Sequence, residues 1–313
     1  MPQVSVVIPV FNAKHCLRTA IDSALGQSLR DLEVIVVDDG STDGSLEAVR
    51  AWFDREPRVR VIDGGPNRGP AYARNLGIAA AQSDWIALLD ADDWYAAERI
   101  ETLVRFGNRL EADIIGDNQY LVTDRRTEPF GVLFTPSDRI AHVLSLGEYL
   151  AHNLPGRGLG WGLVKPLIRR QFLLRHGVRY APVRFGEDFI FYAQCLERGC
   201  RFILYREPLY YYRYIHEDRT RAADDVMDLL KGNDVVENLL RGQPEYASLL
   251  RRRRRLILLA VRYERVKRPL KEGRFQAAAA EIKKDVGILP FAAYRLARAT
   301  GFRAIKRIDT AGW

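Results

Sequence analysis

Four apolar runs recur through the first ninety residues, and a stretch with helical spacing follows each of the first three. The runs occupy residues 4–9, 32–39, 58–63 and 84–90. The first run, 4–9, is almost continuously apolar, which is typical of a strand buried on both faces of a sheet. Strands that alternate with helices build βαβ units, so the pattern predicts an α/β domain with a mainly parallel sheet.

Polar and small residues gather where each predicted strand ends. These ends carry residues 9–13, 38–44, 64–69 and 90–94. In open α/β sheets, ligands lie beyond the carboxyl ends of the strands, so one edge of the sheet is the expected site. Helix capping is enough to explain Ser41, Thr42 and Asp43, but it does not explain the aspartates of "DADDW".

Asp90, Asp92 and Asp93 place three negative charges directly behind a buried strand. Like charges this close repel each other, and a bound cation relieves the repulsion. Carboxylate oxygens suit Mg²⁺ or Mn²⁺, which complete their coordination with water and phosphate oxygens. The coordination positions that the aspartates leave open suit a diphosphate. The G-x-G-x-x-G and P-loop motifs are both missing from the sequence, so neither a nicotinamide cofactor nor ATP hydrolysis is indicated.

Five segments, taken in order, resemble family 2 of the inverting glycosyltransferases: "VSVVIPVFNA", "VIVVDDGSTDGS", "NRGPAYARNLGI", "DWIALLDADDW" and "GEDFIFY". The resemblance implies a GT-A fold, Rossmann-like, over residues 1–220, and leaves residues 221–313 as a helical basic extension. It also implies inverting transfer of a sugar from a nucleoside-diphosphate sugar, most commonly a UDP-sugar, to a hydroxyl of a glycan.

The resemblance assigns the donor site residue by residue. Pro9 and Phe11 would border the nucleoside, and Asp39 would accept a hydrogen bond from an N–H of the base. Arg68 and Arg74 would contact the base or the phosphates. Pairing with a carboxylate at the sheet edge is the alternative for Arg74.

The same resemblance assigns the metal site. Asp90 and Asp92 would contact ribose, sugar and metal, with Asp92 or Asp93 as the direct ligand; the sequence leaves that choice open. His216 would be a further metal or diphosphate contact, against the alternative of an ordinary surface or core histidine. Trp94 either covers the site or packs in the core.

The acceptor side is expected at "GEDFIFY", which opens a predicted amphipathic helix. Its apolar face would carry Phe189, Tyr192, Ala193 and Leu196. Acidic residues suit the first turn of any helix. However, inverting transfer needs a base for the acceptor hydroxyl, and the resemblance makes Asp188 that base and Glu187 an acceptor-binding or orienting group.

Residues 153–173 contain four glycines and two prolines, which favours a loop near the site. Trp161 in this segment is expected to stack on an acceptor sugar, and a buried structural tryptophan is the alternative. Lys165 and Arg169 are basic positions whose role the sequence leaves open. Arg213 is a further candidate contact for the diphosphate.

Composition indicates a globular chain, and the charge is uneven along it. With 47% hydrophobic and 28% charged residues, the 313-residue chain is globular, and its three cysteines are too few for a disulfide framework or a zinc cluster. The net charge is +8, and residues 221–313 carry 21 Lys/Arg against 11 Asp/Glu. A basic tail of this kind suggests an anionic partner surface.

Two tail segments, 251–270 and 289–308, combine arginines with apolar residues at helical spacing. Such helices bind anionic membranes, and a helical subdomain packed on the core is the alternative. No stretch approaches the roughly 20 apolar residues that span a bilayer. We therefore expect a cytoplasmic protein, peripheral at the inner face of the plasma membrane, that extends a lipid-linked glycan of an exopolysaccharide or surface polysaccharide.

Three other functions stay open at this point. A nucleotidyltransferase of related fold usually has a Gly-rich basic loop after the first strand, and "PVFNAKHC" lacks it. A nucleic-acid-binding protein would use the arginine-rich tail but leaves the aspartates unexplained, so no nucleic acid is expected. A silent sugar-nucleotide binder is the third. The Q-x-x-R-W signature of processive synthases is missing, which favours addition of a single sugar.

Overall fold

The computed structural model describes residues 2–123, 126–134, 140–155, 160–214 and 223–284. The chain divides into two compact units. The first combines Met1–Tyr149 with Trp161–Glu217, and the second combines Leu150–Gly160 with Asp218–Trp313. The short segment 150–160 thus groups with the C-terminal unit, although nothing in its sequence distinguishes it from its neighbours.

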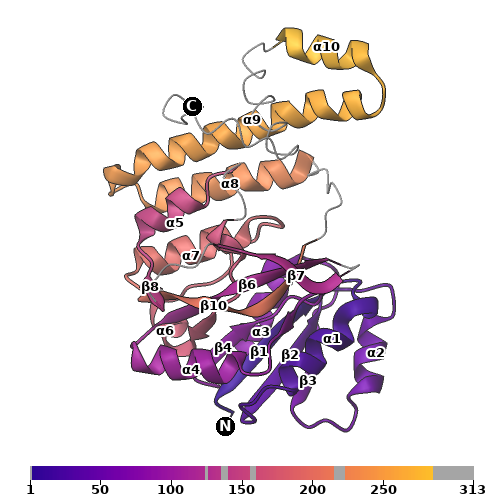
Figure 1. Ribbon diagram of the computed structural model, residues 1–313, viewed down its shortest axis with the longest axis vertical. Coiled ribbons are helices and arrows are strands. Elements are labelled where there is room, and N and C mark those ends of the chain that lie inside the picture. The colour runs from indigo at the N-terminus through magenta and orange to yellow at the C-terminus, as the bar shows by residue number, and fades with distance from the viewer. Residues whose placement is uncertain (1, 124–125, 135–139, 156–159, 215–222, 285–313) are drawn as a thin grey trace. The chain divides into compact units, whose positions relative to one another are not determined.

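A ten-stranded sheet forms the centre of the first unit (Figure 1). Its strands are β1 Val4–Val10, β2 Leu32–Asp38, β3 Val59–Asp63, β4 Trp85–Leu88, β5 Trp94–Tyr95, β6 Ile114–Thr123, β7 Arg126–Val132, β8 Ala141–Val143, β9 Leu167–Arg169 and β10 Phe202–Arg213. The main order is β3-β2-β1-β4-β9-β6-β10-β5, while β7 pairs with β6 and β8 with β10. The first four strands are parallel, as predicted, whereas β9 runs antiparallel to both of its neighbours.

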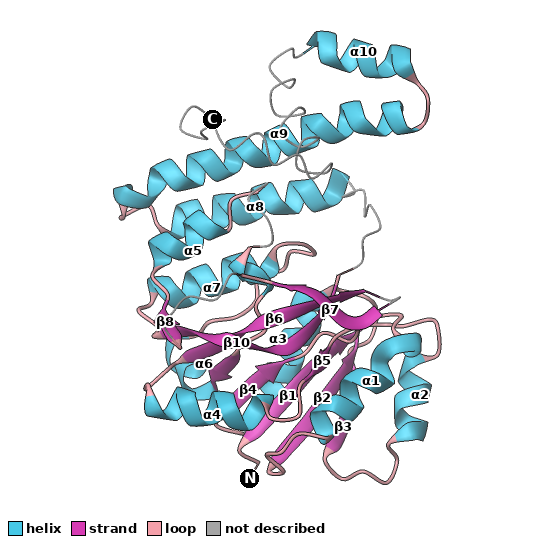
Figure 2. Cartoon of the chain, viewed as in Figure 1, coloured by secondary structure: helices cyan, strands magenta, loops and turns pink. Residues whose placement is uncertain are grey.

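Six helices lie within the first unit in the described chain (Figure 2). They are α1 Lys14–Leu25, α2 Ser45–Trp52, α3 Pro70–Ala80, α4 Arg99–Arg109, α6 Arg170–His176 and α7 Glu187–Glu197, while α5 Leu146–His152 spans the boundary between the two units. The predicted α/β alternation of the first hundred residues is therefore confirmed. The predicted loop at 153–173 is wrong in part, because it contains a 3₁₀ turn at Trp161–Leu163, strand β9 and the start of α6.

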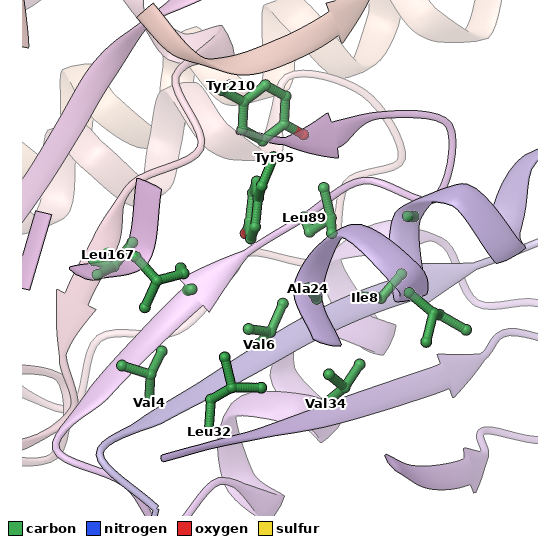
Figure 3. Packing of buried hydrophobic residues seen from close by; sticks show 14 of the residues in the cluster. Val4, Val6, Ile8, Ala24, Leu32, Val34, Leu89, Tyr95, Leu167 and Tyr210 are labelled. Carbon is green, nitrogen blue, oxygen red and sulfur yellow. The ribbon is translucent and has the colours of Figure 1, made fainter. Parts of the chain in front are cut away.

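One face of the sheet packs against α1 and α4. Figure 3 shows Val4, Val6 and Ile8, which alternate along β1, beside Val34 of β2 and Ala24 of α1. All five side chains are buried completely. Each larger aliphatic side chain buried in this way contributes roughly 1.5–3 kcal/mol, so this layer holds the strand ends in place.

The other face of the sheet carries α3, which approaches it closely. A Cβ atom at Gly77 would lie 2.3 Å from Cγ1 of Val7 in β1, so only glycine permits this contact. Arg74 lies three residues earlier, on the same side of the helix. The glycine therefore helps to bring the Arg74 side chain over the carboxyl ends of the strands.

Helix α7 is buried on nearly all sides, so the prediction of an amphipathic helix is wrong. Residues 187–193, 195 and 196 are all buried. The reason is that aromatic rings contact the helix from several directions. Tyr180 stacks on Phe191 with centroids 4.0 Å apart, and Tyr192 meets Phe202 of β10 at 5.6 Å.

The second unit is helical within its described part, with α8 Ala223–Leu239, α9 Ala247–Lys271 and α10 Phe275–Lys284. The apolar positions predicted along α9 pack around Leu259 and Val266 together with Ile282 of α10. Among the described helices, none is long and apolar enough to cross a membrane. The second predicted tail segment, 289–308, lies outside the described residues.

All three cysteines, Cys16, Cys195 and Cys200, are free thiols, as predicted from their number and spacing. Each is buried, with at most 7% of its surface exposed. Burial raises the pKa of Cys16 to about 11, and the pKa of Cys195 and Cys200 lies higher still.

Candidate active site

The carboxyl ends of β1, β2 and β4 lie side by side at one edge of the sheet. In the parallel register Val10 of β1 pairs with Asp38 of β2, and Val7 pairs with Leu88 of β4. The polar segments that follow these strands therefore meet, as the sequence predicted. Phe11, at the end of β1, is 49% exposed at this edge, and Pro9 is half-buried behind it.

Asp39 holds the loop that leads into α3. Its Oδ1 accepts a hydrogen bond of 2.9 Å from the backbone N–H of Arg68, and its Oδ2 accepts one of 2.7 Å from Gly69. The guanidinium of Arg68 lies 3.7 Å from the centroid of the Tyr72 ring. The expected contacts of Asp39 and Arg68 with the base or phosphates stay predictions.

Arg74 joins two of the predicted carboxylates. Its Nη2 lies 2.7 Å from Oδ1 of Asp90, and its Nη1 lies 2.6 Å from Oε1 of Glu187. Only 4% of Arg74 is exposed, and its Nε has no hydrogen-bond partner among the described residues. This is the pairing at the sheet edge that the sequence left open, and a contact of Arg74 with the donor stays a prediction.

Lys165 joins the third carboxylate, Asp188, to Asp90. Its Nζ lies 2.7 Å from Oδ2 of Asp188 and 3.2 Å from Oδ2 of Asp90. Arg74 and Lys165 together connect Asp90, which follows β4, with Glu187 and Asp188 at the start of α7. This five-residue cluster, Arg74, Asp90, Lys165, Glu187 and Asp188, is called the charge cluster below.

The charge cluster shifts the pKa of its members in different directions. Burial raises the pKa of Asp90, but the charges of Lys165 and Arg74 outweigh burial and hold that pKa well below its usual range. Burial and the negative charge of Asp188 raise the pKa of Glu187. Burial lowers the pKa of Lys165, yet the charges of Asp188 and Asp90 raise it above its usual range. Lys165 is therefore a permanent cation.

The carboxylate of Asp93 binds strand β10. Its Oδ2 accepts a 2.6 Å hydrogen bond from the Tyr210 hydroxyl, and its Oδ1 accepts one of 2.7 Å from the backbone N–H of Arg213. Burial and the charges of Asp92 and Asp90 raise its pKa strongly. Both oxygens of Asp93 are therefore engaged in the interior, and the choice between Asp92 and Asp93 as the direct metal ligand stays a prediction.

The strand-end residues fit an open cation site rather than a closed one. Among the residues that the structure describes, no three His, Cys, Asp or Glu side chains gather to hold a metal ion. Asp92 is half-buried, and its main-chain carbonyl accepts a hydrogen bond from Nε of Arg213. A single such carboxylate suits Mg²⁺ or Mn²⁺, which take their other ligands from water and phosphates. His216 lies outside the described residues.

The two candidate tryptophans lie in different surroundings. Trp94 is half-buried and stacks on Tyr211, with ring centroids 5.2 Å apart, and the guanidinium of Arg213 lies 5.5 Å from its ring. Trp161 is half-buried in the 3₁₀ turn, with Phe134 at 6.3 Å. Stacking of Trp161 on an acceptor sugar stays a prediction.

Comparison with known proteins places the chain in a family. The family model "Glycosyl transferase family 2" matches residues 5–153. Over 241 residues the chain is 34% identical to the succinoglycan biosynthesis protein ExoO of Rhizobium meliloti, covering 72% of this chain and 68% of that protein. The chain belongs to glycosyl transferase family 2. The resemblance inferred from five motifs is thereby confirmed.

A second relative, the succinoglycan biosynthesis protein ExoU of Rhizobium meliloti, is 36% identical over 206 residues. That match covers 64% of this chain but only 58% of ExoU. The chain therefore spans less than two thirds of the length of this relative.

Two solved structures share the fold. S. aureus TarS 1-349 in complex with UDP-GlcNAc matches with a TM-score of 0.60 and 15% identity, covering 96% of this chain and 92% of that one. The mannosyltransferase PcManGT from Pyrobaculum calidifontis, in complex with GDP-Man and Mn²⁺, matches with a TM-score of 0.57 and 19% identity, covering 96% and 80%. The predicted GT-A fold is confirmed, and likeness at these identities carries no further conclusion.

Replacement of Arg74 by Met tests the charge cluster. We expect a loss of about 3 kcal/mol of unfolding free energy at pH 7.5, because the half-buried Asp90 and the buried Glu187 lose a shared cation. The deficit should shrink towards pH 5, since carboxyls without the guanidinium take up protons more readily and lose their uncompensated charge. Urea denaturation of the wild type and of Arg74→Met at both pH values measures this loss of unfolding free energy.

The control is Arg18→Met. Arg18 pairs with Asp22 at 3.6 Å on the surface of α1, where its side chain is 61% exposed. Such a pair contributes only a few tenths of a kcal/mol. Equal losses in the two variants, or an Arg74→Met deficit that does not change with pH, would contradict the proposed charge balance.

Proposed function

We propose that the chain transfers a single sugar from a nucleoside-diphosphate sugar, a UDP-sugar in the first place, to a hydroxyl of a glycan, with inversion at the anomeric carbon. One observation carries the proposal. Asp188 is buried, Lys165 engages its Oδ2, and its Oδ1 has no hydrogen-bond partner among the described residues. A buried carboxylate oxygen without a partner is costly unless a substrate group binds it.

In the proposed reaction, that oxygen receives a proton. The acceptor oxygen forms a bond to the anomeric carbon while the bond from that carbon to the diphosphate oxygen breaks. The hydroxyl proton passes to Oδ1 of Asp188, which acts as the general base. Glu187, held by Arg74, lies beside Asp188 in the chain, and it is the proposed group that binds or orients the acceptor.

On the donor side, Asp90 and Asp92 are the proposed contacts to ribose and sugar, and Pro9 and Phe11 border the nucleoside. Asp92 would hold a divalent cation, Mn²⁺ or Mg²⁺, with His216 as a further contact. When bound, such a cation neutralises charge on the departing diphosphate. Arg213 supports the residues around it, because its backbone and side chain bind Asp93 and the carbonyl of Asp92.

Replacement of Asp188 by Asn tests the base. We expect turnover to fall by a factor of about 10² to 10⁴, because an amide cannot take up the proton. UDP affinity, measured by calorimetry, should stay unchanged, since Asp188 lies on the acceptor side. Metal-dependent hydrolysis of a panel of nucleotide sugars supplies the assay and needs no acceptor.

Asp84→Asn is the control, because Asp84 is exposed just before β4, at the opposite end of that strand from Asp90. This variant should retain wild-type turnover. Substantial turnover by Asp188→Asn would assign the base to another residue.

Alanine variants of Asp92 and Asp93 separate the two candidate ligands. We expect Asp92→Ala to weaken the manganese-dependent part of UDP binding by about tenfold or more. Asp93→Ala should keep this part but lose about 1–3 kcal/mol of stability, because it leaves the Tyr210 hydroxyl and the Arg213 N–H without their acceptor. Calorimetry with and without Mn²⁺, beside thermal melting, measures both effects. The reverse pattern would make Asp93 the ligand.

For the acceptor, we propose a lipid-linked glycan at the inner membrane face, in the synthesis of an exopolysaccharide or surface polysaccharide. The names of ExoO and ExoU, which are succinoglycan biosynthesis proteins, support the polysaccharide. The exposed face of α9 supports the proposal that the protein binds a membrane. Spacings of three, four and seven residues place five arginines on this face, which we call the arginine stripe: Arg251, Arg254, Arg255, Arg262 and Arg265.

All five arginines of the stripe are exposed, and Leu258 between them is 39% exposed. Cations around an apolar side chain suit the interface of an anionic leaflet. A nucleic acid would also attract the cations, but it offers Leu258 no apolar surface along its phosphates.

Sedimentation with vesicles rich in phosphatidylglycerol tests this surface. We expect Arg251→Gln, Arg254→Gln and Arg265→Gln, combined, to weaken binding by about 3 kcal/mol at low salt, at about 1 kcal/mol for each cation. The control removes the same charge elsewhere in this unit, with Arg241→Gln, Arg274→Gln and Lys284→Gln. Equal losses in both triple variants, or tighter binding to duplex DNA than to the vesicles, would contradict the membrane proposal.

A further inference from the structure

Lys165 bridges the two carboxylates that the proposed reaction uses on opposite sides of the transferred sugar. Its Nζ lies 2.7 Å from Oδ2 of Asp188 and 3.2 Å from Oδ2 of Asp90. Only 2% of the lysine is exposed. Asp188 lies 23 residues after Lys165 and Asp90 lies 75 residues before it, so only the fold brings these three side chains together.

The backbone around Lys165 is fixed at two points. Its own carbonyl accepts a hydrogen bond from Nη2 of the buried Arg99. The preceding carbonyl, of Val164, accepts one of 2.9 Å from the hydroxyl of Tyr192. Tyr192 lies one helical turn after Asp188 in α7. The lysine is thereby anchored to the same helix that carries the proposed base.

The side chain of Asp188 needs such an anchor. The terminal torsion of an aspartate is broad, so packing alone does not fix the plane of its carboxylate. The hydroxyl of Tyr149 bonds the main-chain carbonyls of Asp188 and Phe189, not the Asp188 side chain. Among the described residues, Lys165 donates a hydrogen bond to this carboxylate, and that bond occupies only Oδ2.

We infer that Lys165 is a positioning residue, which binds Oδ2 of Asp188 so that Oδ1 faces the acceptor hydroxyl at a set distance from Asp90 on the donor side. The inference rests on the proposed role of Asp188 as the base. Lysine suits the task because its ammonium is a compact charge with three N–H donors, which can bond two carboxylates in different planes. No bond to Lys165 forms or breaks in the reaction, and it keeps its protons throughout.

The balance of charge in the cluster also supports a positioning role for Lys165. Asp90, Glu187 and Asp188 face Arg74 and Lys165 in the charge cluster, and Tyr180 and Tyr192 lie close to Asp188. Without Lys165, Arg74 would be the single cation of the cluster for all three carboxylates. The carboxylates would then repel each other, and Asp188 would turn away from Asp90.

The test is Lys165→Met, assayed by hydrolysis of the UDP-sugar that the donor panel identifies. We expect kcat to fall about 100-fold, the loss that misplacement of a reacting group by about 1 Å can cause. The KM for the donor and the affinity for UDP should stay close to wild type, since Asp90 keeps its bond to Arg74. Arg169→Met is the control: this arginine lies four residues later and contacts Asn108 and Trp85, away from the charge cluster.

A second pair of measurements separates charge from packing. Lys165→Gln keeps a polar head of similar reach without the charge, and it should lose kcat as Lys165→Met does. In Lys165→Ala, added propylammonium should raise kcat in a saturable manner, whereas 1-propanol should not. Rescue by the cation alone is a result that a purely structural role would not give.

Three outcomes overturn the inference. They are wild-type kcat in Lys165→Met, loss of UDP affinity in parallel with kcat, and equal rescue of Lys165→Ala by propylammonium and 1-propanol. These outcomes differ from failure of the proposed function, which would show as an active Asp188→Asn variant.

Discussion

Compensation of buried negative charge is the constraint on which this site depends. Asp90, Glu187 and Asp188 come from two distant segments, and their mutual repulsion is tolerable only because Arg74 and Lys165 lie between them. A buried ion pair adds little net stability when it is compared with packed apolar residues. The cluster is therefore better explained by the chemistry of the site than by the stability of the fold.

The other elements of the first unit position the side chains of the charge cluster. Parallel pairing of β1, β2 and β4 aligns the strand ends, and the missing Cβ of Gly77 lets α3 carry Arg74 close to them. Aromatic rings around α7 hold its first turn in place. Asp93 connects the segment after β4 to β10 through hydrogen bonds with Tyr210 and Arg213.

Local periodicity was enough to predict β1 to β4 and the helices between them, because runs rich in apolar residues alternate with stretches of helical spacing. It failed for β9, where three residues follow a Gly- and Pro-rich stretch and pair only with strands distant in sequence. The predicted strand ends and the family motifs identified the acidic residues Asp90, Glu187 and Asp188 from the sequence. The role of Lys165 was not predictable, because it depends on contacts across 23 and 75 residues that leave no local pattern.

The burial of every native sulfhydryl has a practical consequence. Cys16, Cys195 and Cys200 are shielded from solvent and hold their protons at neutral pH, so they react slowly with maleimides. A single cysteine introduced at an exposed position, such as Phe11 or Leu258, would then be the preferred attachment point for a dye. Fluorescence from either position could follow events at the strand ends or along α9 without first removing the natural cysteines.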